Sequence, residues 1–223
     1  MDNRHRADRQ LANLLGMVNR SLRQGFEMAG KRRFDEQLVF NVAMELLERR
    51  GYKEATMVEL AEATGVRRGA LYNAYGSKEE FIVRAFNYLA GKFYEQVDHA
   101  LTKPDRRAGL QSFFELIIPV GTTSRCAAVI ATRLTTESGD SSHRLRDSLA
   151  DFFAKLEQLL SDALSEEPDG IQLSMSADDA AKLVVATTRG IAVMRNIHMN
   201  HAKVTAVTSA LLNAVISAAP QDL

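Results

Sequence analysis

The stretch TMVELAEATGVRRGALYNAYGSK, residues 56–78, predicts two short helices that are joined by a tight turn and followed directly by a longer helix. Thr56 and Glu59 have the spacing of a capping box, in which each side chain accepts a hydrogen bond from the other residue's backbone N–H at the start of a helix. Gly65 is expected to end the first short helix, because glycine tolerates a positive φ. The inward face of this helix is expected to consist of Val58, Leu60 and Ala61.

The second short helix, residues 67–75, combines a small apolar face with a polar one. The residues expected to point inward are Ala70, Leu71 and Ala74. Two cations, a phenol and an amide are expected to point outward, from Arg67, Arg68, Tyr72 and Asn73. A short helix with these outward groups lacks the chemistry of an enzyme and suits the major groove of DNA.

Helices are also expected on both sides of these two. Residues 34–50 place leucines and valines on one helical stripe, with acidic residues early and arginines late, as the helix dipole favours. Ser77 and Glu80 repeat the capping-box spacing, so a long helix is expected to begin at Lys78. Together these segments predict a three-helix, helix-turn-helix DNA-binding domain over residues 34–80.

Composition and charge limit the possible classes of protein. The chain has 223 residues and no formal net charge, but residues 1–78 carry 14 Lys and Arg against 10 Asp and Glu. A basic end on an acidic remainder suits a protein that touches DNA with one end. A single cysteine excludes a disulfide framework within the chain and fits a reducing cytoplasm. We find no apolar run of membrane-spanning length and no secretory pattern, so we expect a cytoplasmic protein without a membrane partner.

Residues 1–33 form an N-terminal extension, and three interpretations of residues 1–27 stay open. Apolar residues recur there at helical spacing, which favours an amphipathic helix packed on the rest of the protein. The arginines among them would also suit a basic arm that adds phosphate contacts. The third interpretation is that translation begins at Met28, because MAGKRRFD has the form of a complete beginning.

Residues 81–223 have helical periodicity almost throughout, with no strand pattern and no internal repeat. The predicted fold class is therefore all-α, with the helix-turn-helix domain followed by a C-terminal helical bundle. The last two helices, expected at residues 177–198 and 202–218, are apolar on wider faces than a surface helix needs. Such faces indicate either a homodimer interface or helices buried in the core.

The segment FDEQLVFNVAMELLERRGYKEATMVELAEATGVRRGALYNAYGSKEEFIVRAF, residues 34–86, resembles the DNA-binding domain of the TetR family of bacterial transcription regulators. The resemblance covers about 50 residues without a gap and includes the Gly-Tyr after the first helix, Gly65-Val66, Leu71-Tyr72 and Gly76-Ser77-Lys78. RCAAVIA at 125–131 and AAKLVVATTRGIAVMRN at 180–196 look like recurring segments of the family's helical body.

The resemblance implies a homodimer, formed through the last two helices, that places two recognition helices in successive major grooves of a palindromic operator, roughly 34–36 Å apart. By position, Thr56, Tyr72 and Lys78 match residues that contact phosphate. Residues matching the base-reading positions are Arg68, Gly69, Ala70 and Asn73. Arg68 can bind guanine with two hydrogen bonds, and Asn73 can pair with adenine.

Two departures from the family pattern affect this helix. Arg67 stands where the family usually has a small capping residue, so the helix is expected either to start without a good cap or to gain a phosphate contact. Ala74-Tyr75 replaces the common His-Phe pair, which removes one expected phosphate donor.

A small-molecule effector site is expected inside the bundle, because several aromatic and basic residues fall in otherwise apolar helices. Its candidate residues are Phe113, Phe114, Cys126, Arg133, Phe152, Arg189 and Met194. A buried arginine needs an anionic partner, either a side chain or a ligand carboxylate. Cys126, beside Arg125, is also a candidate for sensing oxidants or electrophiles.

The predicted function is a repressor that a small-molecule effector releases from its operator. The alternatives are a DNA-binding protein that needs no ligand and a redox-sensing regulator that acts through Cys126. No phosphate loop or nucleophile motif is present, so neither an enzyme nor a cofactor is expected. His198 and His201 lack a third ligand, so we expect no metal site.

Overall fold

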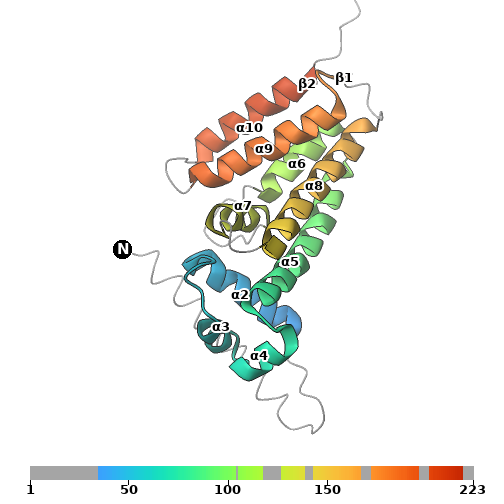
Figure 1. Cartoon of the computed structure of the whole chain (residues 1–223). Helices are drawn as coiled ribbons and strands as arrows, with labels where there is room; N and C mark the ends of the chain where they lie inside the picture. The colour runs from blue at the N-terminus through green and yellow to red at the C-terminus, as the bar shows by residue number, and fades with distance from the viewer. Residues whose placement is uncertain are drawn as a thin grey trace, which may run out of the picture. The chain divides into compact units, whose positions relative to one another are not determined.

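The computed structural model describes residues 35–103, 105–117, 127–138, 143–166, 172–195 and 201–217 (Figure 1). The N-terminal extension with Met28 and the segment containing Cys126 lie outside these residues. The elements in chain order are α2 (Glu36–Arg50), α3 (Met57–Thr64), α4 (Arg68–Tyr75), α5 (Lys78–Leu101), α6 (Arg106–Ile117), α7 (Ala127–Ser138), α8 (His143–Ser165), β1 (Gln172–Leu173), α9 (Ala177–Arg195), α10 (His201–Val215) and β2 (Ile216–Ser217).

The described chain divides into two compact units. The first, which we call the head, contains the residues up to Leu89 together with Glu137–Leu145. The second, which we call the body, contains Ala90–Thr136 and the residues from Arg146 onward. The predicted all-α fold class is confirmed, and no described helix is long and apolar enough to cross a membrane.

An aromatic cluster forms the core of the head. The ring of Phe40 on α2 lies 5.9 Å from that of Tyr75, 6.0 Å from that of Phe81 and 5.7 Å from that of Tyr88. The rings of Tyr75 and Phe81 are 4.8 Å apart. Because the cluster joins the end of α4 to α2 and α5, it fixes the orientation of the short α4 helix within the head.

The inward face of the two short helices differs from the sequence-based prediction. In α3, Leu60 is buried as expected, but Val58 is 43% exposed and Met57 takes its place in the core. In α4, Ala70 and Ala74 are exposed, whereas Leu71 is buried. The bulky Tyr75 lies in the core instead, because its ring fills more space than an alanine and its hydroxyl donates a 2.8 Å hydrogen bond to Glu36 Oε1.

The turn after α2 is tied to Glu137, the residue before the last of α7. Gly51 ends α2 with φ +85°, and the backbone N–H of Tyr52 donates a 2.8 Å hydrogen bond to Glu137 Oε2. A Cβ at Gly51 would lie 2.5 Å from the same oxygen. Glycine is required here for two reasons, the backbone conformation and the close approach of a carboxylate.

Gly51→Ala is therefore expected to destabilise the head by about 1–3 kcal/mol, because φ +85° with ψ 166° is a backbone conformation that essentially only glycine adopts, with a further loss as Glu137 is displaced. Chemical denaturation followed by circular dichroism measures this change. Gly91→Ala is the matched control, since this helical glycine has no atom within 4 Å of an added Cβ and should gain stability slightly. Equal effects of the two substitutions on stability would contradict the requirement for glycine at position 51.

The body consists of helices whose apolar faces meet in a common core. Phe93 and Tyr94 of α5 pack against Phe152 of α8, with ring centroids 5.9 and 5.5 Å apart, and the Tyr94 hydroxyl donates to the Phe152 carbonyl oxygen. Helix α10 lies beside α9 and also contacts α6, where Arg107 donates a 2.9 Å hydrogen bond to Asn213 Oδ1 (Figure 1).

The body also contains a short antiparallel strand pair that the sequence analysis did not predict. Gln172 pairs with Ser217 and Leu173 with Ile216. Two residues are too few for a period-two pattern to be recognised, and the pairing joins segments more than 40 residues apart in sequence.

Candidate functional site

The outer face of α4 presents most of the residues predicted to contact DNA. Arg67, Arg68, Gly69, Ala70 and Asn73 are all exposed. Tyr72 is 38% exposed, and the Arg68 guanidinium carbon lies 5.4 Å from the centre of its ring. This distance is within the range of a cation–π contact between the two exposed side chains.

The start of α4 has no side-chain cap. Arg67 is the N-cap residue, and its side chain accepts no hydrogen bond from the backbone of the first turn. Arginine has no acceptor atom, so the first N–H groups of α4 keep their capacity to bind an external oxygen. A Cβ at Gly69 would meet no atom within 4 Å, so packing against the described residues does not require a glycine at this position.

Thr56 caps α3 through the predicted capping box. Its hydroxyl oxygen accepts a 3.2 Å hydrogen bond from the Glu59 N–H, and its own N–H donates a 3.0 Å bond to Glu59 Oε2. The bonds from the backbone and hydroxyl of Thr56 hold the pKa of the Glu59 carboxyl below its ordinary value. Arg50 adds an ion pair with Glu59 at 3.4 Å.

Lys78 is half-buried at the start of α5 and is bonded to the turn after α2. Its Nζ donates a 2.5 Å hydrogen bond to the Tyr52 carbonyl oxygen and lies 4.7 Å from the centre of the Tyr52 ring. Burial lowers the pKa of the ammonium, while the charges of Glu59 and Glu54 act in the opposite direction. An ammonium has three donors, so Lys78 can hold this turn and still donate to a phosphate.

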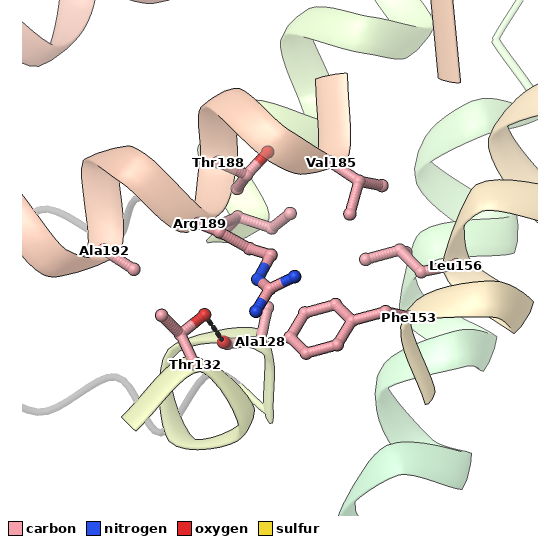
Figure 2. A pocket seen from close by; sticks show the side chains of 9 residues that line it. Ala128, Thr132, Phe153, Leu156, Val185, Thr188, Arg189 and Ala192 are labelled. Carbon is pink, nitrogen blue, oxygen red and sulfur yellow. Dashed lines mark hydrogen bonds between the residues drawn. The ribbon is translucent and has the colours of Figure 1, made fainter. Parts of the chain in front are cut away.

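A narrow cleft lies in the body between α7, α8 and α9 (Figure 2). It contains about 220 Å³ of empty space, part of it open to solvent, and its enclosed part has room for roughly one water molecule. The lining residues are Ile117, Ala128, Thr132, Phe153, Leu156, Val185, Thr188, Arg189 and Ala192.

Among the predicted effector residues, only Arg189 lines this cleft. Phe113, Phe114 and Phe152 are buried in the core of the body, where Phe113 and Phe114 pack edge to face. Arg133 is half-buried on α7, and Met194 on α9 is 53% exposed. The structure thus brings none of the other described candidates to the cleft.

Phe153, Thr132 and Thr188 line the cleft and are absent from the predicted effector set. Phe153 adjoins the predicted Phe152 on α8, and both fit a helical apolar stripe, so the sequence alone does not tell which ring faces a cavity. The two threonines are buried in apolar helices, and each hydroxyl donates to a carbonyl four residues earlier. A buried threonine in an apolar helix is a weak signal, because this local bond satisfies its hydroxyl.

Within the residues described here, no group of three or more His, Cys, Asp or Glu side chains is placed to hold a metal ion. His201 begins α10, and His198 lies outside the described residues.

Residues 39–85 match the family model for bacterial regulatory proteins of the tetR family. The chain is also 29% identical over 70 residues to YuxN of Bacillus subtilis (strain 168), described as an uncharacterized HTH-type transcriptional regulator. That match covers 31% of this chain and 24% of YuxN, so the chain spans about a quarter of that relative's length.

Two solved structures share the fold along most of the chain. The reduced form of NemR from E. coli is 22% identical, with a TM-score of 0.71 over 84% of this chain and all of that one. A cysteine mutant of the TetR family regulator CifR, in complex with a 26-base-pair operator duplex, is 20% identical, with a TM-score of 0.74 over the same shares. The family model thus covers the head segment from residue 39 to residue 85, and the two solved structures show that the chain shares their fold.

Proposed function

We propose that the protein is a sequence-specific DNA-binding transcription regulator that reads its operator with the exposed face of α4. The observation that carries this proposal is the composition of that face. It holds an arginine within cation–π distance of a tyrosine, an asparagine, and small residues that allow close approach, and all of these residues are exposed. Arginine and asparagine are the side chains that bind guanine and adenine edges with two hydrogen bonds each.

In this proposal the residues around α4 contact the DNA backbone. The Tyr72 hydroxyl and the ammonium of Lys78 supply phosphate donors, and Thr56 lies at the start of α3, where N–H groups attract an anion. The first N–H groups of α4, left without a side-chain cap, add a further phosphate site, beside the Arg67 cation.

We further propose that two copies pair through α9 and α10. Within the part of the body that the structure describes, the large exposed apolar residues all lie on these two helices: Leu183, Val193, Met194 and Val207. A group of exposed apolar residues on neighbouring helices is typical of an interaction surface. A symmetric dimer would present two α4 helices to the two halves of a palindromic operator.

Leu183→Glu combined with Val207→Glu is expected to weaken the dimer by roughly tenfold, about 1.4 kcal/mol, because a carboxylate would be buried without a partner. Sedimentation of the purified chain across a concentration series measures the dissociation constant of the dimer. Ala154→Glu, an exposed position on α8, is the matched control and should leave association unchanged. Dimers equally stable in the double variant would contradict an interface on these two helices.

The regulator is proposed to act as a repressor that an effector releases. An effector shifts the equilibrium only if it binds one body conformation more tightly than another, so its site belongs in the body, where the cleft is. Cys126 lies outside the described residues, and redox sensing through it stays an alternative hypothesis. Cys126→Ser would keep DNA binding and lose any response to peroxide if that alternative holds.

The direct test is binding of the purified chain to DNA flanking its own coding region, compared with unrelated DNA at near-physiological salt. The proposal is supported if the chain binds the flanking DNA tightly and an Asn73→Ala, Tyr72→Phe double variant loses this binding. Unchanged binding in that variant would contradict the role of α4.

A further inference from the structure

The guanidinium of Arg189 points into the cleft of the body from α9 (Figure 2). Its central carbon lies 4.2 Å from the centre of the Phe153 ring, which α8 contributes. Arg189 is half-buried, and the cleft wall around it is otherwise mostly aliphatic, from Ile117, Leu156 and Val185. A partly exposed cation therefore borders a small cleft with a mostly apolar wall.

No side chain that the structure describes neutralises this cation. Among the described residues, no carboxylate lies within 4.0 Å of Arg189, and no acceptor bonds to its N–H groups. Because a partly desolvated guanidinium without an anion is unfavourable, the site is suited to an anion that is not part of the chain.

The contact with Phe153 positions the guanidinium for such an anion. A cation within about 6 Å of a ring centre is held by the ring, and its N–H donors remain available to an acceptor. These donors form a rigid fork that matches the two oxygens of a carboxylate. The hydroxyls of Thr132 and Thr188 donate to the Ala128 and Val184 carbonyl oxygens, so the donors for a carboxylate come from Arg189.

We propose that this cleft binds a small organic monocarboxylate, with its carboxylate on Arg189 and its apolar body against Phe153 and the aliphatic wall. The enclosed part has room for only about one water molecule, so the acid would lie across the open part of the cleft with its carboxylate at the guanidinium. The role of this acid as the effector rests on the proposed function above. The binding of the acid to the body does not depend on that function.

The probe is benzoate, titrated calorimetrically into the full-length protein without DNA, with benzamide as the neutral ligand of the same shape. Benzoate is expected to bind at least tenfold more tightly than benzamide, a comparison that requires no variant. Arg189→Gln should weaken benzoate at least tenfold. Lys182→Gln, on the same helix with its ammonium paired to Asp178 at 2.6 Å, should leave benzoate affinity unchanged.

Three results would overturn the site: no benzoate binding at millimolar concentration, equal affinities for benzoate and benzamide, or an Arg189→Gln protein that binds benzoate normally. A parallel titration with operator DNA separates the two proposals. Benzoate that binds through Arg189 but leaves DNA affinity unchanged would overturn its effector role. A protein that binds benzoate and no specific DNA would overturn the proposed function while the carboxylate site stands.

Discussion

Phe81→Ala is expected to lower the stability of the head by about 3–5 kcal/mol, the range for removal of a fully buried phenylalanine. Phe81 has no exposed surface, and its ring contacts those of Tyr75 at 4.8 Å and Phe40 at 6.0 Å. The substitution removes the common neighbour of α2 and α4 and leaves a cavity between them. Since domains are stable by only about 5–15 kcal/mol, α4 should lose its fixed orientation in a sizeable fraction of molecules.

Hydrogen exchange of the backbone amides in α2–α4 measures this local stability directly. Protection there should fall by about two to four orders of magnitude, while protection of α9 changes little. Val58→Ala serves as the control, because Val58 is 43% exposed and its truncation should cost less than about 1 kcal/mol. Retained protection in Phe81→Ala would show that the aromatic cluster does not hold the head together.

Arg68→Ala is expected to remove discrimination at one base pair of each operator half-site, worth about 1–3 kcal/mol. Arg68 is exposed in the first turn of α4 and is therefore assigned to a base edge. The matched control is Arg67→Ala, one residue earlier at the start of α4. If Arg67 contacts phosphate, its loss weakens all sequences alike and reduces the salt dependence of binding.

Competition titrations with single-base-pair variants of the operator, at several salt concentrations, separate the two roles. Arg68→Ala should flatten the preference at one position and leave the others unchanged. A uniform loss across all duplexes would show that Arg68 binds only phosphate and that another residue reads the bases.

Local sequence signals predicted the helix-turn-helix well because they depend on neighbouring residues. The Thr56–Glu59 capping box, the turn at Gly65 with φ +70° and the start of α5 at Lys78 all follow from contacts within four positions. The inward face of α4 was predicted less well. Periodicity placed two alanines inside, whereas Tyr75 is buried because a partner 39 residues away, Glu36, satisfies its hydroxyl.

Contacts between distant residues were beyond prediction from the sequence. The Tyr52–Glu137 hydrogen bond joins residues 85 positions apart, and no periodic pattern marks either partner. Likewise, the residues around Arg189 come from α6, α7, α8 and α9, so the cleft depends on how these helices pack. Arg189 itself was predicted on chemical grounds, since a basic residue in an apolar helix requires an anion.

The central claim, that α4 reads DNA in a symmetric dimer, is tested most directly by selection from a random-sequence duplex library. The purified full-length protein is mixed with the library at near-physiological salt, and the bound duplexes are sequenced. We predict enrichment of a palindrome whose half-sites lie about one helical turn apart, roughly 34–36 Å, and loss of that enrichment in an Arg68→Ala, Asn73→Ala variant. Recovery of no common sequence, or of the same palindrome with the variant, would contradict the claim.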